Sequence, residues 1–311
     1  MRAIRQLAVG GPEVLELVEV ERPSPGPGEV LVRVRAAGVN PADWKIRAGT
    51  ARRIVEPPFT PGLDLAGVVA EVGAEVTGLR PGDRVYGMVF PPHGAQAEYV
   101  TVPADALAPV PPSVDLVQAA ALPTAGLTAW QSLVRTAEVR SGQRVLIHAA
   151  AGGVGHLAVQ IAKAHGAYVI GTARAAKHGF LRDLGADELI DYTVTDFTTA
   201  VRDVDIVLDP IADDYGPRSL TVLSPGGLLV DVRGTGPDRT AVRAQAEQQG
   251  LRFVEFGVTP SVSDLADIVA LAACGGLRVA VEQVLPLADV AKAHELSESG
   301  RVRGKIVLEV P

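Results

Sequence analysis

The stretch His148-Ala-Ala-Ala-Gly-Gly-Val-Gly155 is the strongest indication of how this chain folds. It joins the end of a short apolar strand to a predicted helix over residues 155–166 that has an apolar face. Gly152 and Gly155 occupy the last two glycine positions of a dinucleotide-binding loop, and Ala150 stands at the first. Backbone without side chains can approach a pyrophosphate closely, and a helix N-terminus presents unpaired N–H groups and the positive end of its dipole. Glycine turns also close ordinary loops, but the strand–loop–helix context favours nucleotide binding.

Helices and short apolar strands alternate through the second half of the chain, from about residue 116. Beside the helix over 155–166 we expect a helix around 177–184, and strands at 144–148, 168–171, 188–190, 205–208 and 227–231. This alternation is typical of a doubly wound parallel sheet in an α/β fold. Two further helices, over 263–274 and 290–299, and a strand over 305–310 follow, and we expect the last stretch to return to the first domain.

The first part of the chain has a different pattern. Glu29-Val-Leu-Val-Arg-Val-Arg35 alternates apolar and polar residues, as a strand with one wet face does, and the dense turn sequence Pro23–Gly28 precedes it. Further strands are predicted at 65–72, 83–89 and 95–102. Short strands separated by glycine and proline indicate a partly open β-barrel with few helices.

Bulk properties exclude several classes of protein. A chain of 311 residues is longer than a domain with a single hydrophobic core usually is, so two domains are expected. The net charge of −7 disfavours nucleic acid as the main partner. We expect no membrane partner and a cytoplasmic protein, because no run of about 18 apolar residues occurs and residues 1–10 lack the apolar core of a secretion signal. The lone cysteine, Cys274, can supply neither an intrachain disulfide nor a multi-thiolate zinc site.

The residues after the second strand of the parallel sheet favour NADPH over NADH. A site selective for NAD usually places an acid there to hold the ribose 2′-hydroxyl, yet residues 152–182 contain no Asp or Glu. Arg174 and Lys177 lie just beyond that strand instead, where two cations can pair with a 2′-phosphate. The alternative is that both are solvated residues at the start of a helix.

Blocks of sequence in a constant order make the chain resemble the zinc-independent medium-chain dehydrogenases/reductases, and within them the zeta-crystallin-like quinone oxidoreductases. The blocks are Ala36-Ala-Gly-Val-Asn-Pro-Ala-Asp43, Pro61-Gly-Leu-Asp-Leu-Ala-Gly67, Val72-Gly73, Gly82-Asp-Arg-Val-Tyr-Gly87, Ala121-Leu-Pro-Thr-Ala-Gly-Leu-Thr-Ala-Trp130, Ala149–Gly155, Leu184-Gly-Ala-Asp187, Ile190-Asp-Tyr192 and Arg303-Gly-Lys-Ile-Val-Leu308. The resemblance implies a GroES-like substrate domain over 1–120 and 260–311, a Rossmann NADPH-binding domain over 121–259, and a homodimer.

The resemblance also implies roles for individual residues. By position, the cofactor-binding residues are Asn40, Thr128, Gly152, Gly153, Val154, Arg174, Lys177, Tyr192, Val232, Phe256 and Val258. The glycine loop would meet the pyrophosphate, Lys177 and Tyr192 the 2′-phosphate, and Thr128 and Asn40 the nicotinamide. Relatives often have serine at the position of Arg174, and a pair of glycines where this chain has Pro210-Ile-Ala-Asp-Asp214. The conformation of that loop is left open.

Asn40 stands where zinc alcohol dehydrogenases similar to this chain place a cysteine, so we predict no metal. Without a Lewis acid an alkoxide is not stabilised, which disfavours oxidation of an unactivated alcohol. Reduction of a quinone, or of an alkene conjugated to a carbonyl, needs only hydrogen-bond donors for the developing oxyanion. Asn40 is our candidate catalytic residue for that task, and its alternative is a turn residue before Pro41. Asp43 and Tyr86 are interpreted as structural, and no general acid is identified.

Three functions therefore remain open. The first is an NADPH:quinone or enone reductase. The second is an enoyl-thioester reductase like the reducing modules of polyketide synthases, which usually read Asn-Phe-Arg-Asp where this chain reads Asn40-Pro-Ala-Asp43. The third is a non-catalytic NADPH-binding protein.

Overall fold

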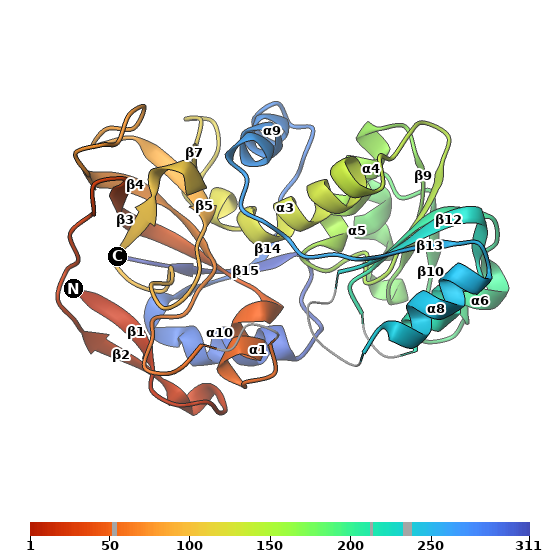
Figure 1. Cartoon of the computed structure of the whole chain (residues 1–311), viewed down its shortest axis with the longest axis horizontal. Helices are drawn as coiled ribbons and strands as arrows, with labels where there is room; N and C mark the ends of the chain where they lie inside the picture. Colours follow the sequence, from red (N-terminus) through yellow and green to blue (C-terminus); the bar gives the residue numbers. More distant parts are fainter. Residues whose placement is uncertain (52–54, 212–213, 233–237) are drawn as a thin grey trace. The chain divides into compact units, whose positions relative to one another are not determined.

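The computed structural model describes residues 1–51, 55–211, 214–232 and 238–311, and the chain forms two compact units (Figure 1). Unit 1 comprises Met1–Leu127, Thr259–Gly275 and Val279–Pro311. Unit 2 comprises Thr128–Val258 and Gly276–Arg278. The second unit is thus inserted into the first, as the sequence predicts. Residues 121–127, predicted to begin the nucleotide-binding domain, belong to unit 1.

Side-chain packing explains where the two units divide. Gly126, in helix α3 (Pro123–Trp130), packs closely on Ile268 of helix α9, because a Cβ at residue 126 would lie 3.2 Å from Ile268 Cγ2. Gln160 in turn holds a late segment of the chain in unit 2. Its Nε2 donates to the Arg278 carbonyl at 2.9 Å and its Oε1 accepts from the Arg278 N–H at 2.7 Å.

Unit 2 is a parallel six-stranded sheet with the strand order β10-β9-β8-β11-β12-β13. Its strands are β8 (Arg144–Ile147), β9 (Tyr168–Thr172), β10 (Glu188–Ile190), β11 (Val204–Asp209), β12 (Leu223–Asp231) and β13 (Arg252–Glu255). Its helices are α4 (Gly155–Ala164), α5 (His178–Asp183), α6 (Phe197–Ala200), α7 (Tyr215–Leu220) and α8 (Thr240–Gln248). Helices α4 and α8 cover opposite faces of the sheet (Figure 1). The strand order reverses between β8 and β11, which is the Rossmann topology that the sequence predicts.

Strands of unit 2 are apolar because both faces of the sheet are covered. Leu146, Ile170, Val207 and Leu229 come from four neighbouring strands and pack in one cluster of buried side chains. This explains why the unit reads as short unbroken apolar runs rather than as alternating residues.

Unit 1 is built on a largely antiparallel sheet with the order β14-β15-β3-β4-β5-β7, and β6 also pairs with β3. Strands β1 and β2 form a separate pair. The strands are β1 (Arg2–Gln6), β2 (Leu15–Glu19), β3 (Glu29–Val39), β4 (Asp64–Val72), β5 (Arg84–Met88), β6 (Tyr99–Pro103), β7 (Leu107–Pro109), β14 (Val281–Pro286) and β15 (Lys305–Glu309). The helices, besides α3, are α1 (Pro41–Arg47), α2 (Leu116–Ala120), α9 (Val262–Ala273) and α10 (Val290–Glu298). The final strand returns to this unit, as expected, and pairs with β3.

Strand β3 is longer than the sequence predicts. The alternating pattern ends at Arg35, but the strand continues to Val39. Its register with β4 shifts between Val34 and Ala36, and residues beyond the shift are buried on both faces. A strand that is buried on both faces carries no alternation, so the pattern stops before the strand does.

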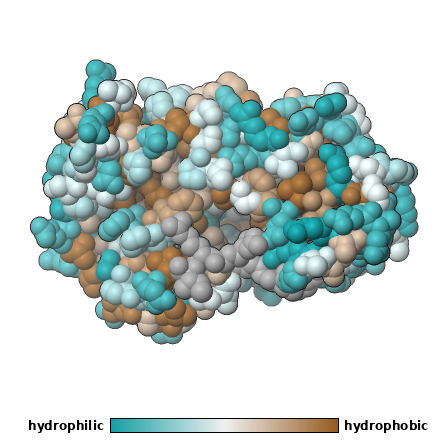
Figure 2. Space-filling model, in the orientation of Figure 1, coloured by the Kyte–Doolittle hydropathy of each residue, from teal (hydrophilic) through white to brown (hydrophobic). Residues whose placement is uncertain are grey.

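The surface mixes hydrophilic and hydrophobic residues on the face shown in Figure 2. Among the described residues, the larger apolar side chains that are exposed include Leu7, Val9, Leu17, Val194 and Val284. Within the same part of the chain, every helix is too short or too polar to cross a membrane.

Candidate cofactor-binding and active site

The glycine loop of unit 2 begins with a strained residue. Ala149 has φ 48°, in the left-handed region that residues other than glycine seldom adopt. Its carbonyl accepts a 2.8 Å hydrogen bond from the Gly152 N–H, and the neighbouring Ala150 N–H donates to the Thr172 carbonyl of β9 at 3.0 Å. Backbone strain of this kind persists only where surrounding contacts impose it. Here the contacts bend the chain sharply from the end of β8 toward the start of α4.

The two glycines of the fingerprint do different work. A Cβ added at Gly152 would have one close neighbour, the Ala149 carbonyl oxygen at 3.2 Å, so space is open beside that residue. A Cβ at Gly155 would lie 2.5 Å from the same oxygen and 2.7 Å from Ala150 Cα. Gly155 therefore allows the helix to pack on the loop, and Gly152 leaves room for a group that is not part of the protein. This is a backbone cradle that fits a pyrophosphate.

The predicted cofactor-binding residues of unit 2, except Thr128, follow the carboxyl ends of parallel strands. Gly152, Gly153 and Val154 follow β8, Arg174 and Lys177 follow β9, Tyr192 follows β10, Val232 follows β12, and Phe256 and Val258 follow β13. Because the strands are parallel, these ends meet at one edge of the sheet, where ligands bind in open α/β folds. Thr128 lies instead on α3 and is nearly buried.

Backbone hydrogen bonds hold two of these segments against the sheet. The Val232 N–H donates to the Asp209 carbonyl at 2.9 Å, and the Phe256 N–H donates to the Asp231 carbonyl at 2.8 Å. The sequence left the conformation of the loop of residues 210–214 open. In this loop the Ile211 N–H donates to Asp209 Oδ1 at 2.9 Å. Ala212 and Asp213 lie outside the described residues.

Arg174 and Tyr192 meet at the turn after β9. The Arg174 Nε donates to the Tyr192 hydroxyl at 3.2 Å, and both side chains are exposed. Lys177 ends the short 3₁₀ turn that Arg174 begins. Two cations and a phenol thus follow the ends of β9 and β10, and Arg174 and Tyr192 are in direct contact. This is a donor set suited to a phosphate monoester.

One carboxylate near this turn was missed by the sequence analysis. Asp191 Oδ2 accepts from the Ala175 N–H at 3.0 Å, and its Oδ1 accepts from the Thr193 hydroxyl at 2.7 Å. The Thr193 hydrogen bonds lower the pKa of Asp191, so it is ionised. Asp191 lies beyond the stretch 152–182 that contains no acid, because it directly follows the next strand, β10. Both of its oxygens are engaged by this loop.

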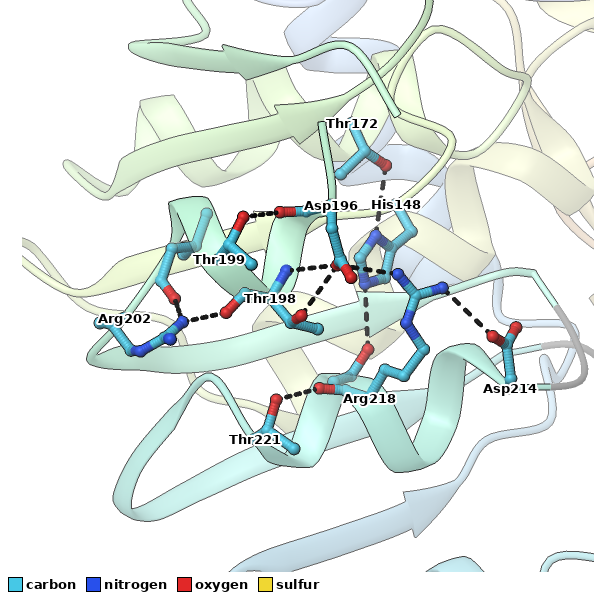
Figure 3. Close-up of polar contacts among 11 residues, drawn as sticks. His148, Thr172, Asp196, Thr198, Thr199, Arg202, Asp214, Arg218 and Thr221 are labelled. Atoms are coloured by element: carbon cyan, nitrogen blue, oxygen red, sulfur yellow. Dashed lines mark hydrogen bonds and ion pairs between the residues drawn. The ribbon is translucent and has the colours of Figure 1, made fainter. Parts of the chain in front are cut away.

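His148, the residue before the loop, ties three elements of unit 2 together (Figure 3). Its Nδ1 lies 3.2 Å from Thr172 Oγ1 at the end of β9, and its Nε2 lies 3.0 Å from Ser219 Oγ in α7. The ring also packs edge-on against Phe197 and Tyr215. Burial, and to a lesser extent the charge of Arg218, lowers the pKa of His148 to about 3. The neutral ring positions the ends of β8 and β9, from which the glycine loop and the Arg174 turn start.

Asn40 lies at the centre of a buried polar network in unit 1. It precedes helix α1, and its Nδ2 donates to Asp64 Oδ2 at 2.8 Å. Its Oδ1 accepts from Lys305 Nζ at 2.5 Å, and Lys305 also lies 3.4 Å from Asp64 Oδ2. Thr124 completes the network from α3, donating from its N–H to Asp64 Oδ1 at 2.8 Å. The candidate catalytic amide is therefore held by a buried ion pair.

Asp64 and Lys305 were not singled out from the sequence, although each carries a signal. Asp64 begins the apolar strand β4 and Lys305 begins the apolar strand β15, and both are almost completely buried. A charged residue within an apolar strand is seldom buried unless it has a partner. The partners come from opposite ends of the chain, so the pattern shows the two charges but not their contact.

Asp43 and Tyr86 make buried hydrogen bonds within unit 1. Asp43 Oδ2 accepts from the Asn40 N–H at 2.7 Å and caps helix α1. Burial is the main cause that raises the pKa of Asp43 to about 7; the Asp64 charge acts in the same direction, and backbone hydrogen bonds and the Lys305 charge oppose it. The Tyr86 hydroxyl donates to the Leu265 carbonyl at 2.5 Å, and burial raises the pKa of this phenol.

The donor set for a metal ion is poor throughout the part of the chain that the structure describes, where no group of three or more His, Cys, Asp or Glu could hold one. Cys274 is exposed at the end of α9. His156 faces its own loop, with Nδ1 2.9 Å from the Gly152 carbonyl oxygen. The ring nitrogens of His148 and the Nδ1 of His156 are thus close to hydrogen-bonding groups of the protein itself.

Two family models match the chain, and they define its class. The alcohol dehydrogenase GroES-like domain matches residues 26–112, and the zinc-binding dehydrogenase model matches residues 184–308. A GroES-like unit joined to a Rossmann unit is the architecture of the medium-chain dehydrogenases/reductases.

Similarity to individual proteins is high over nearly the whole chain. Quinone oxidoreductase of Sus scrofa is 34% identical, covering 99% of this chain and 97% of that protein. The 2-haloacrylate reductase of a Burkholderia species is 37% identical, covering 96% of each. The structure of Escherichia coli quinone oxidoreductase complexed with NADPH has a TM-score of 0.92 and 32% identity, covering 99% of this chain and 100% of that chain.

This chain is an oxidoreductase that belongs to the zeta-crystallin-like quinone oxidoreductase family of medium-chain dehydrogenases/reductases.

Proposed function

We propose that this protein is an NADPH-dependent reductase that transfers hydride to a quinone or an α,β-unsaturated carbonyl compound without a metal ion. The observation that carries the proposal is the contact of Arg174 with Tyr192, with Lys177 three residues further along the chain, at the same edge of the parallel sheet as the glycine loop. A dinucleotide with a 2′-phosphate needs a cradle for its pyrophosphate and cations for that phosphate. Similarity to a quinone oxidoreductase complexed with NADPH supports the same cofactor.

We assign each part of the cofactor to residues of suitable chemistry. The open space beside Gly152 and the first turn of α4 would take the pyrophosphate. Arg174, Lys177 and Tyr192 would take the 2′-phosphate through charge-assisted hydrogen bonds. Val232, Phe256 and Val258 would provide apolar contact at the ends of β12 and β13. Thr128 and Asn40 remain the candidates to contact the nicotinamide.

When bound, NADPH would supply a hydride from C4 of its nicotinamide to the acceptor, with loss of that C–H bond and oxidation to NADP⁺. The acceptor must already be electron-poor, because the groups that we assign to its oxygen are hydrogen-bond donors. In an enone the new C–H bond forms at the β-carbon, the C=C π electrons shift, and the carbonyl oxygen becomes an enolate oxygen. Water supplies the second proton. We assign to Asn40 the task of donating a hydrogen bond to that oxygen as its charge develops.

Turnover with a panel of acceptors tests the proposal. The protein is mixed with NADPH and, separately, with a quinone, an enone, a haloacrylate and an enoyl thioester, and absorbance at 340 nm is followed. Consumption with the quinone or enone supports the proposal. Turnover of the thioester alone would make this an enoyl reductase, and tight NADPH binding with no acceptor would make it a non-catalytic binding protein.

We also propose a cytoplasmic homodimer. The need for NADPH, an intracellular reductant, supports the location, and the family resemblance supports the dimer. Light scattering of the purified protein would give a mass near twice 32.3 kDa. A mass of one chain at micromolar concentration would refute the dimer.

A further inference from the structure

Lys305 is a buried cation whose three N–H bonds all have acceptors. Its side chain is 3% exposed. Nζ donates to the Val39 carbonyl at 2.9 Å, to Asn40 Oδ1 at 2.5 Å and to Asp64 Oδ2 at 3.4 Å. An ammonium has three donors and no acceptor, so Lys305 has no proton left to offer a substrate. Any effect it has on the reaction must pass through its partners.

The partner that can transmit such an effect is Asn40. Since an ammonium can only donate, the amide oxygen of Asn40 must face Lys305 and the NH₂ group must face Asp64. Asp64 is fixed in turn, because its other oxygen accepts from the Thr124 N–H at 2.8 Å and from the Thr124 hydroxyl at 2.5 Å. The amide thus has one possible orientation.

One hydrogen of the Asn40 NH₂ group is used by Asp64, and within the described ranges the other has no acceptor. A cation on the oxygen of an amide draws electron density from the nitrogen and strengthens the remaining N–H as a donor. The effect is larger in a buried site, where the local dielectric is low.

We propose that Lys305 is a positioning residue for hydride transfer, which orients and polarises the Asn40 amide so that its second N–H stabilises the oxyanion of the acceptor. This inference rests on the proposed reductase function and on the assignment of Asn40 within it. In this arrangement the Lys305 ammonium is hydrogen-bonded to the oxygen of the Asn40 amide, and the N–H of the same amide contacts the substrate.

The alternative is that Lys305 serves only to pair a buried carboxylate. Removing one partner of a buried ion pair strongly destabilises a protein, because the other charge is left buried and unpaired. A purely structural role would lower the melting temperature and the yield, yet it would leave the rate of hydride transfer in the folded fraction unchanged. The rate and the stability therefore separate the two roles.

The experiment compares Lys305→Met with the double variant Asp64→Asn/Lys305→Met, which removes both charges and leaves no orphaned ion. For each we measure kcat with a quinone, the KM for NADPH, the fluorescence-detected NADPH affinity and the melting temperature. We expect kcat to fall about 10- to 100-fold in both variants, somewhat less than the loss of a whole oxyanion donor, with the KM for NADPH within about twofold of the parent's. The double variant decides the question if the single variant does not fold.

Arg47→Met is the matched control, because it also removes a buried cation from unit 1. The Arg47 Nε donates to the Gly10 carbonyl at 3.1 Å, and the guanidinium also contacts His294 and Glu298. None of these contacts involves Asn40. We expect a lower melting temperature and a kcat within about twofold of the parent's.

A double-mutant cycle with Asn40→Ala tests transmission through the amide. If Lys305 acts through Asn40, Lys305→Met has little further effect on kcat in the Asn40→Ala background. Additive losses, or an unchanged kcat in both Lys305 variants, would overturn the inference while leaving the reductase assignment intact. Failure of the parent protein to turn over any acceptor would overturn the proposed function, and this inference with it.

Discussion

The carbonyl oxygen of Ala149 lies 2.5 Å from the place that a Cβ at Gly155 would occupy. The same oxygen accepts the Gly152 N–H, and a Cβ at Gly152 would clear it at 3.2 Å. One strained turn thus faces the protein at one glycine and open space at the other. Gly155 is therefore needed for the fold, and Gly152 is needed for cofactor binding in the function that we propose.

Two substitutions in this turn should have different effects. We expect Gly152→Val to fold normally and to lose NADPH affinity by at least about 100-fold, because the side chain enters the space for the pyrophosphate. Gly155→Ala should lower the stability of unit 2 by about 1–3 kcal/mol, because its Cβ overlaps backbone. Circular dichroism melts and fluorescence titration with NADPH measure the two effects. NADPH binding of unchanged affinity by Gly152→Val would refute the loop assignment.

Lys177 should govern the choice between the two nicotinamide cofactors. We expect Lys177→Ala to raise the KM for NADPH about 10-fold while changing the KM for NADH by less than twofold, because only NADPH carries the 2′-phosphate. Steady-state kinetics with both cofactors measure this. Arg174→Ala should act in the same direction, because Arg174 contacts Tyr192 in the same group. Equal losses with both cofactors would argue against the phosphate role.

His148 should make the stability of the protein depend on pH in the acid range. Burial lowers its pKa from 6.5 to about 3, so the unfolded chain takes up a proton that the folded chain does not. Stability from this residue is therefore present above pH 6.5 and is lost as the pH falls toward 3. Between pH 7 and pH 5 the expected loss is about 2 kcal/mol.

His148→Gln removes this contribution and keeps polar atoms near Thr172 and Ser219. The variant should be less stable than the parent at pH 7, and the gap should narrow by about 2 kcal/mol at pH 5. Urea unfolding at the two pH values provides the comparison. His294, whose pKa burial also lowers to about 3, contributes equally in both proteins and cancels. A gap independent of pH would mean that folding does not lower the pKa of His148.

Asp43 should act with the opposite sign. Burial raises its pKa from 3.8 to about 7, so the folded chain holds a proton that the unfolded chain has lost. This contribution is complete below pH 3.8 and falls as the pH rises to 7, by up to about 1.4 kcal/mol per pH unit. Asp43→Asn can still accept the Asn40 N–H and does not ionise. Its stability relative to the parent should rise from pH 5 to pH 7, and a constant difference in urea midpoints would contradict the raised pKa.

Turnover should survive the removal of metal ions. Because the reaction we propose uses hydrogen-bond donors rather than a Lewis acid, dialysis against a strong zinc chelator should change kcat by less than about twofold. Zinc content is measured in parallel by atomic emission. Stoichiometric zinc whose removal abolishes turnover and whose return restores it would refute the mechanism.

Local sequence was sufficient for the glycine loop and five of the six strands of the Rossmann unit, because their determinants are contiguous. The loop of residues 148–155 sits between a strand and a helix, each short enough to be recognised from its apolar residues. The predicted strand over 188–190 matches β10 at both ends. Strand β13 was missed, since four partly exposed residues in Arg252–Glu255 carry little pattern.

Sequence alone determined the class of fold, the glycine loop and the cations after β9, because each is encoded by residues close together in the chain. Only the tertiary structure decided the surroundings of Asn40. Its partner Asp64 lies 24 residues away in the sequence, and Lys305 lies a further 241 residues beyond Asp64. The tertiary structure likewise decided that His148 joins β9 and α7, and that Asp191 reaches the turn after β9. Periodicity reports which face of an element is buried, but not which buried charge meets which, because that depends on strand pairing across the whole fold.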